Sequence, residues 1–146
     1  MNKTILLVED NPDDELLAIR ALSKHQAVSD VVIARDGLEA CEYLFGEGKY
    51  SSRDLTTQPE LVLLDLQLPK LGGLDVLKKI RTNKITQLLP VVILTSSKEE
   101  TDLVKGYELG ANSYIRKPVD YDQFVNAVQQ LKLYWLVLNE SPPTRS

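Results

Sequence analysis

The sequence contains little that would tie this chain to a membrane, an oxidising compartment or a nucleic acid. Cys41 is the only cysteine in 146 residues, so no disulfide can form within the chain and a reducing, cytoplasmic location is expected. No apolar run approaches the ~18 residues of a membrane span, and the first one is too short for a signal peptide. The net charge of −4 argues against a nucleic acid or an anionic membrane as the partner.

Several motifs of common binding sites are also missing. With one cysteine and one histidine, the chain has no cluster of soft ligands that would hold zinc. It has neither the G-x-x-x-x-G-K-S/T loop that binds nucleoside triphosphates nor the G-x-G-x-x-G loop that binds dinucleotides.

The composition is that of a globular domain, with 43% hydrophobic and 26% charged residues. The length suits a single domain, to which we assign residues 1–140. The final residues, 141–146, read Ser-Pro-Pro-Thr-Arg-Ser and are expected to be disordered. A polar segment, residues 47–58, is expected to be a long surface loop.

Short apolar runs alternate with amphipathic helical patterns along the chain. Each run is continuous, which is typical of strands buried on both faces of a parallel sheet. Residue pairs that favour a helix start follow three of the runs, as Asn11-Pro12, Asp36-Gly37 and Gly72-Gly73. Five such strand–helix units predict an α/β fold with a doubly wound parallel sheet. The runs are residues 5–8, 31–33, 61–64, 91–94 and, more weakly, 113–115.

The most hydrophobic stretch, LVLLDLQLPKLGG, contains Asp65 directly after its four apolar residues. Burying an ionised carboxylate alone is costly, so this side chain needs partners or a function. In an open α/β sheet, the carboxyl ends of the strands form the edge where ligands bind. The sequence places Glu9-Asp10, Asp65, Thr95 and Lys117 at such ends.

These side chains suit one kind of chemistry. Three carboxylates held close together repel one another unless a cation lies between them, and Mg²⁺ prefers oxygen ligands of this kind. Lys117 and Thr95 add a positive charge and a hydroxyl group, which can neutralise a transferring phosphoryl group. An aspartate can itself be the nucleophile and form an aspartyl-phosphate.

Taken in order, these residues resemble the motifs of the receiver domain of two-component response regulators. They are Glu9-Asp10, Asp65 followed by Leu-Gln-Leu-Pro and Gly-Gly, Thr95-Ser96, and Lys117-Pro118. The resemblance covers residues 3 to about 138. It implies the flavodoxin-like (βα)5 fold with strand order 2-1-3-4-5, in a bacterial signalling protein that is not a metabolic enzyme.

The resemblance also implies a role for each motif. Asp65 would accept a phosphoryl group from a phosphohistidine on a sensor histidine kinase. Asp10, Asp65 and the backbone carbonyl of Gln67 would bind Mg²⁺ or Mn²⁺, with Glu9 acting through a water molecule. Lys117 would pair first with Asp65 and then with the phosphoryl group.

A conformational switch is implied in the same way. Thr95 would move to form a hydrogen bond with a phosphoryl oxygen, and Tyr114 would move inward as it does so. The peptide bond between Lys117 and Pro118 would be cis, which is an option specific to proline.

Each of these residues also has a plain structural interpretation. Asp65 could cap the helix that follows it, and Glu9-Asp10 could be a capping cluster before Pro12. Thr95 could belong to a helix N-cap, and Tyr114 could simply pack within its strand.

Only eight residues follow the last predicted helix, residues 120–138, so we expect a stand-alone regulator whose output is binding to other proteins. From Leu131 onward this helix is apolar on nearly every face, and its end is expected to overhang the sheet. Such an end is typical of a partner site, here a homodimer through the fourth and fifth helices and the neighbouring strand. Alternatively, the end folds back onto its own domain. The candidate interface residues are Leu133, Tyr134, Leu136 and Val137.

The long loop and the ending Tyr-Trp-Leu-Val-Leu-Asn-Glu resemble regulators paired with phytochrome-type sensor kinases. Two other functions remain open. A phosphatase with an aspartate nucleophile would need a second Asp two residues after Asp65, where this chain has Gln67. A receiver-like adaptor would bind partners without phosphorylation, and only activity separates it from a working receiver.

Overall fold

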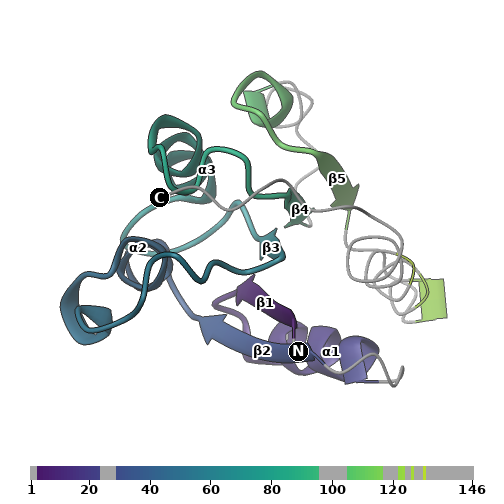
Figure 1. The fold of residues 1–146 in the computed structure, drawn as a ribbon. Coiled ribbons are helices and arrows are strands. Elements are labelled where there is room, and N and C mark those ends of the chain that lie inside the picture. The colour runs from purple at the N-terminus through teal and green to yellow at the C-terminus, as the bar shows by residue number, and fades with distance from the viewer. Residues whose placement is uncertain are drawn as a thin grey trace.

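The computed structural model describes residues 3–23, 29–95 and 105–116, together with residues 122, 123, 126 and 130. Within them, five strands form one parallel sheet, and helices cover both of its faces (Figure 1). The strand order is β2-β1-β3-β4-β5, which confirms the doubly wound order that the resemblance implied. The strands are β1 (Lys3–Val8), β2 (Ser29–Ala34), β3 (Leu61–Leu64), β4 (Val91–Thr95) and β5 (Ser113–Arg116). The helices are α1 (Pro12–Ser23), α2 (Gly37–Phe45), the short 3₁₀ helix η1 (Gly48–Tyr50) and α3 (Gly73–Thr82).

The strand order reverses at β1, because the chain passes from β1 to β2 on one side and then returns to the other side as β3. Val8 at the end of β1 pairs with Ala34 of β2 and with Leu64 of β3. The carboxyl ends of these three strands therefore lie level with one another. Ligands of open α/β sheets bind at such a reversal, so the residues that follow β1 and β3 are the candidates for a site.

Successive residues of each strand point to opposite faces of the sheet, and both faces are buried. Ile5 and Leu7 of β1 belong to a core cluster with Leu22 of α1 on one face. Leu6 and Val8 belong to a second cluster with residues of α2 and α3 on the other face. The side chains of β3 are fully buried, which explains why its sequence is a continuous apolar run. Burial of each such side chain contributes roughly 1.5–3 kcal/mol to stability.

The predicted starts of the first two helices are confirmed by their capping bonds. Oδ1 of Asn11 accepts hydrogen bonds from the N–H groups of Asp13 and Asp14 at 2.9 and 3.2 Å, so Asn11 is the N-cap of α1. Asp36 caps α2 in the same way, because its Oδ1 accepts from the Glu39 N–H at 2.7 Å.

Residues 47–58 form a folded loop, whereas the sequence predicted only a long polar connection. Arg53 organises it, because its Nε donates to the Tyr43 carbonyl oxygen at 2.6 Å and its Nη1 donates to that of Thr57 at 2.6 Å. The guanidinium carbon also lies 4.1 Å from the centre of the Tyr43 ring, a cation–π contact. The loop is thereby tied to the last turns of α2, an arrangement that composition alone does not reveal.

Two further observations concern burial and membrane crossing. Cys41 is buried, and burial raises the pKa of its thiol to about 11, which suits an inert core residue. Within the described ranges, no helix has the length and apolar character that crossing a bilayer requires. The predicted last helix, residues 120–138, lies almost entirely outside the described residues, as does the tail, residues 141–146.

Candidate functional site

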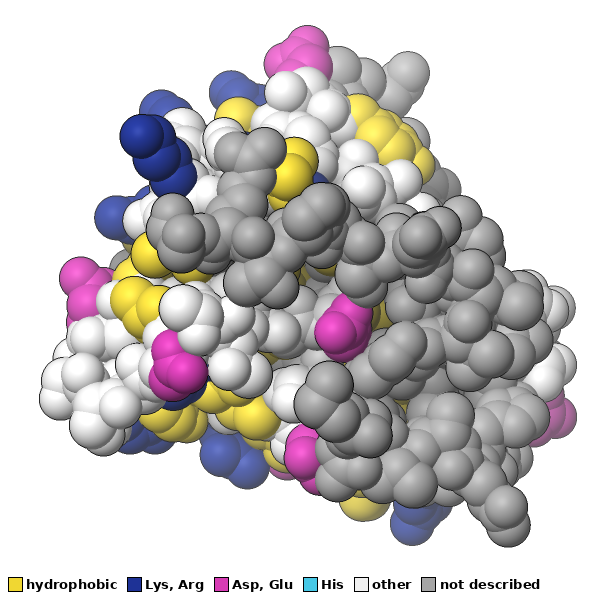
Figure 2. Space-filling model, in the orientation of Figure 1, with side chains coloured by type: hydrophobic (Ala, Val, Ile, Leu, Met, Phe, Trp, Pro, Cys, Tyr) yellow, Lys and Arg dark blue, Asp and Glu magenta, His cyan; other side chains and the backbone are white. Residues whose placement is uncertain are grey.

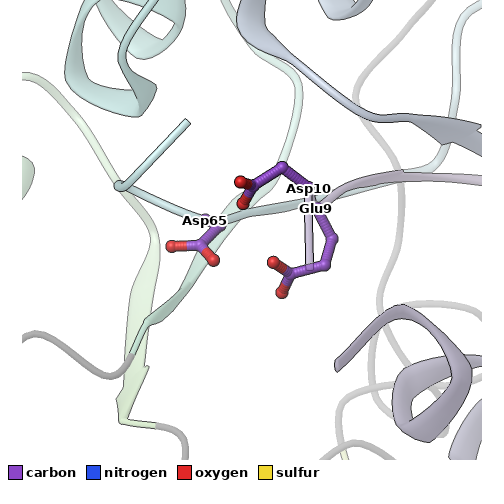
Figure 3. A group of neighbouring side chains, drawn as sticks. All are labelled: Glu9, Asp10 and Asp65. Atoms are coloured by element: carbon purple, nitrogen blue, oxygen red, sulfur yellow. The ribbon is translucent and has the colours of Figure 1, made fainter. Parts of the chain in front are cut away.

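Three carboxylates meet at the carboxyl edge of the sheet. Glu9 and Asp10 follow β1, and Asp65 follows β3. One oxygen from each side chain lies within 4.8 Å of the other two (Figure 3). Glu9 is 3% exposed and Asp65 is 7% exposed, whereas Asp10 faces solvent. The cluster thus combines two buried acids with one that solvent can reach.

The sheet itself holds two of these residues in place. The Asp65 N–H donates to the Val8 carbonyl oxygen at 3.0 Å, and the Glu9 N–H donates to that of Ala34 at 3.0 Å. The hydrogen-bond ladder thus continues one residue beyond the ends of β1 and β3. Because these strands are buried on both faces, both acids project from a rigid backbone.

The turn after Asp65 sets the direction of its side chain, because Oδ1 accepts a hydrogen bond from the Gln67 N–H at 3.1 Å. The chain then folds back, and the Gly73 N–H donates to the Leu66 carbonyl oxygen at 3.0 Å. A Cβ at Gly73 would overlap the Asp65 carbonyl group and the Leu66 Cα, so α3 can approach this closely only at a glycine. The N-cap of α3 is Gly72, so the alternative that Asp65 is the capping residue of this helix is wrong.

Glu9 has a structural contact beside its place in the cluster. Its Oε2 accepts from the Asn11 N–H at 3.3 Å, which steadies the residue that caps α1. The capping bonds to Asp13 and Asp14 come from Asn11 itself. Glu9 therefore supports the helix start without being its cap, and its carboxylate still lies beside the other two acids.

The donor set fits a hard divalent cation. Three like charges at this spacing repel one another, and a cation among them relieves the repulsion. Carboxylate oxygens are ligands that Mg²⁺ and Mn²⁺ prefer, and Mg²⁺ commonly uses one or two carboxylates together with water. Because Asp10 is exposed, such an ion would also be reachable by a ligand from solvent.

Two ion pairs lie on the segments next to these acids. Nε of Arg35, directly after β2, lies 3.1 Å from Oε1 of Glu15 on α1. Nζ of Lys70, in the loop after Asp65, lies 3.5 Å from Oδ2 of Asp36. Both cations are more than half exposed, so each pair contributes at most about 1 kcal/mol to stability.

The space-filling view in Figure 2 shows how charged side chains are distributed on one face of the molecule. Lys and Arg side chains lie along the margin of this face, and an acidic side chain is visible near its middle.

The backbone places three further residues that the sequence singled out. Thr95 is the last residue of β4 and pairs with Arg116 of β5. Tyr114 of β5 pairs with Ile93 of β4. Gln67 is exposed in the loop that follows β3. Thr95 therefore ends its strand at the same edge of the sheet as the acids, and the roles suggested for these three residues stay predictions.

The other predicted site residues lie outside the described part of the chain. Lys117 and Pro118 are among them, so the lysine contact and the cis peptide bond stay predictions. The same holds for the candidate interface residues, which are Leu133, Tyr134, Leu136 and Val137.

Two features of the loop after Asp65, one contact and one backbone conformation, were not predicted from the sequence. Gly37, the first residue of α2, lies against the backbone of Leu71, where a Cβ would overlap the carbonyl group. Lys70 has a φ of 66°, a left-handed conformation that is unusual for a residue with a side chain. The Asp-Gly pair indicated a helix start and Pro-Lys-Leu-Gly is typical of a turn, but neither pattern shows which segments meet.

Comparison with known proteins identifies a family for this arrangement. The family model described as response regulator receiver domain matches residues 5–129, which include all three acids of the cluster. The response regulator Rcp1 of Synechocystis sp. is 38% identical over 134 residues, covering 92% of this chain and 89% of Rcp1. A probable methanogenesis regulatory protein, FilR2 of Methanothrix harundinacea, is 40% identical over 139 residues, covering 94% of this chain and 86% of FilR2.

Two solved structures are similar over nearly the whole chain. The phosphorylated cyanobacterial phytochrome response regulator RcpA matches with a TM-score of 0.91 at 38% identity, covering 98% of this chain and 100% of RcpA. The Mn²⁺-bound form of a response regulator Rcp1 matches with a TM-score of 0.89 at 37% identity, covering 97% of this chain and 99% of that one.

Proposed function

We propose that this chain, which belongs to the family of response regulator receiver domains, accepts a phosphoryl group on Asp65 from a sensor histidine kinase. One observation carries the proposal: Asp65 is buried at the end of β3, with an oxygen of Glu9 and one of Asp10 within 4.8 Å. In a family of signalling proteins, a buried carboxylate beside groups that can hold a divalent cation is suited to be the acceptor. The proposed location of this signalling is the cytoplasm.

Mg²⁺ is the proposed cofactor. Asp10, Asp65 and the backbone carbonyl of Gln67 would hold it, and Glu9 would contribute through water. When bound, it would offset the negative charge of the acids and of the incoming phosphoryl group. The all-oxygen donor set supports this assignment, and so does the Mn²⁺-bound form of the similar protein Rcp1.

In the proposed step, a carboxylate oxygen of Asp65 forms a bond to phosphorus as the P–N bond of the donor phosphohistidine breaks. The imidazole nitrogen keeps the electron pair of that bond. Because the Gln67 N–H already holds Oδ1 of Asp65 at 3.1 Å, the carboxylate is oriented before the donor arrives.

The proposed response to phosphorylation uses residues at two neighbouring strand ends. Lys117 would pair with the new phosphoryl group, and Thr95 and Tyr114 would change conformation together. The output would then be binding to another protein. The position of Thr95 at the end of β4 and that of Tyr114 within β5 support this proposal.

A phytochrome-type kinase is the proposed partner, because the similar protein RcpA is a phytochrome response regulator. FilR2 has a comparable identity and is named for methanogenesis instead. Similarity of this degree therefore supports a histidine kinase as the partner class. Phosphoryl transfer from individual purified kinases would show which kinase is the partner, and hence which stimulus the protein serves.

Intact mass measurement tests the acceptor proposal directly. After incubation with Mg²⁺ and acetyl phosphate or phosphoramidate, we expect a single phosphoryl adduct on the parent protein. Chelation of the divalent cation before the donor is added should prevent the adduct. Absence of an adduct, both with small donors and with a kinase, would favour an adaptor that binds partners without phosphorylation.

A homodimer through the fourth and fifth helices and the neighbouring strand is also proposed. Replacing Tyr134 and Trp135 together with alanine should reduce the mass found by light scattering to that of a monomer, because large aromatic side chains dominate interface energetics. Leu16→Ala, which truncates an exposed leucine on α1, is the control and should leave the mass unchanged. A double variant with the parent's mass would exclude this interface.

A further inference from the structure

The loop that carries Gln67 is held by the starts of two helices. Residues 66–71, here called the acceptor loop, leave the sheet after Asp65 and end before Gly72, the N-cap of α3. We infer that Asp36 and Gly37, at the start of α2, position the acceptor loop and its Gln67 carbonyl for metal binding and phosphoryl transfer. This inference rests on the proposed function and adds to it a positioning element from a different strand–helix unit.

The contact at Gly37 joins two backbones. A Cβ at this position would overlap the carbonyl carbon and oxygen of Leu71. The Gly37 N–H also donates to the Pro69 carbonyl oxygen at 3.4 Å. A backbone cannot turn aside as the end of a flexible side chain can, so a larger residue at Gly37 must displace either the acceptor loop or α2.

Helix α2 is the more firmly held of the two partners. Its apolar face, including the fully buried Leu44, packs in the core. Its first turn is closed by two further bonds, in which the Glu39 N–H donates to Asp36 Oδ1 at 2.7 Å and the Arg35 N–H donates to Glu39 Oε1 at 2.9 Å. A larger side chain at Gly37 would therefore displace the acceptor loop rather than α2.

The acceptor loop carries its own constraint at Lys70. The φ of 66° at this residue lies in the left-handed region, which residues with side chains rarely adopt. Nζ of Lys70 lies 3.5 Å from Oδ2 of Asp36, the carboxylate that also caps α2. A rare conformation persists only where neighbouring contacts determine it. Here the Leu71 N–H donates to the Pro69 carbonyl oxygen at 2.7 Å across Lys70, and the start of α2 adds the Gly37 bond to the same oxygen and the ion pair with Asp36.

Gln67 lies between two such backbone contacts. Gly73 lies against the carbonyl group of Asp65 and against Leu66, so closely that a Cβ would overlap them. Gly37 lies equally close to Leu71 at the other end of the acceptor loop. The position of the Gln67 carbonyl therefore depends on both helix starts. Groups that orient a metal ligand without touching the metal change its affinity by about 10–100-fold when they are altered.

Calorimetric titration with Mn²⁺ alone tests the inference. Gly37→Ala is expected to weaken Mn²⁺ binding about tenfold or more relative to the parent. Gly72→Ala is the matched control, because it makes the same change beside the acceptor loop where the nearest atom to a new Cβ is Asp75 Oδ2 at 3.7 Å. Leu22→Ala controls for lost stability, because Leu22 is buried in the core cluster on the opposite face of the sheet. Both controls should bind Mn²⁺ like the parent.

Parent-like Mn²⁺ affinity in Gly37→Ala would overturn the inference. Equal weakening in Leu22→Ala would also overturn it, because the effect would then follow from stability alone. A parent protein that binds no divalent cation and forms no phosphoryl adduct would instead overturn the proposed function, and the inference with it.

A second measurement uses only the parent protein, so it decides the matter even where Gly37→Ala does not fold. During titration with Mg²⁺, the amide resonances of Asp36 and Gly37 are expected to shift together with that of Gln67. The resonance of Gly46, at the far end of α2, should stay in place and serves as the control. A stationary Gly37 resonance alongside a shifting Gln67 resonance would overturn the inference.

Discussion

Replacing Asp65 with asparagine is expected to abolish the phosphoryl adduct while the protein stays folded. An amide has no carboxylate oxygen to attack phosphorus, so the acyl phosphate cannot form. The side chain keeps its shape, and its carbonyl oxygen can still accept the Gln67 N–H bond that Oδ1 of Asp65 accepts at 3.1 Å. The measurements are intact mass after incubation with Mg²⁺ and acetyl phosphate, and urea unfolding.

The same substitution should not lower stability when divalent cations are absent. Glu9, Asp10 and Asp65 each place an oxygen within 4.8 Å of the other two, and removing one of three like charges reduces their repulsion. Residues kept for function commonly lower the stability of the fold that holds them. A urea midpoint well below that of the parent would indicate that Asp65 serves mainly the fold.

Two further variants separate the acceptor from a metal ligand. Asp10→Asn keeps the acceptor but removes a proposed ligand, so the adduct should form more slowly and require more Mg²⁺. Asp75→Asn removes an exposed carboxylate from the first turn of α3 and should behave like the parent. An undiminished adduct in Asp65→Asn would place the acceptor elsewhere, with Asp10 the first residue to test.

The strands and the acidic edge could be predicted because their signals are local. A continuous apolar run such as residues 61–64 is typical of a strand buried on both faces, and the residue after it emerges at the edge of the sheet. Once the runs are assigned to one parallel sheet, Asp10 and Asp65 fall on the same edge. The strand order came from the resemblance to receiver domains, because the crossover rules alone allow several orders.

The contacts of Gly37, Arg53 and Arg81 could not be predicted, because they depend on which distant segments the fold brings together. In the sequence, Arg81 looks like a solvated cation near the end of an amphipathic helix. Its guanidinium instead binds Gly110 and Asn112, which are 29 and 31 residues away in the chain. No local pattern encodes a meeting of this kind.

Replacing Arg81 with methionine is expected to lower the free energy of unfolding by roughly 3 kcal/mol. Its Nε donates to the Gly110 carbonyl oxygen at 2.8 Å, its Nη1 to that of Leu89 at 2.7 Å, and its Nη2 to Asn112 Oδ1 at 2.9 Å. Asn112 Oδ1 in turn accepts the Val91 N–H at 2.8 Å. One guanidinium thus joins α3 to the starts of β4 and β5.

The size of this effect follows from the acceptors that the substitution leaves behind. A hydrogen bond to a charged donor contributes about 1.5–3 kcal/mol, and water recovers part of that where the acceptor becomes exposed. Burial lowers the pKa of Arg81, but the guanidinium stays charged at neutral pH, so these bonds are present under ordinary assay conditions. The expected fall in Tm is about 10 °C for a domain of this size.

Two variants of the same helix make the test of Arg81 specific. Lys78→Met removes an exposed cation from α3 and should change the free energy of unfolding by less than about 0.5 kcal/mol. Arg81→Lys should fall between the two, because an ammonium group keeps the charge but cannot reach acceptors in three directions. If Arg81→Met and Lys78→Met had the same free energy of unfolding, the junction of α3 with β4 and β5 would depend on packing rather than on this guanidinium.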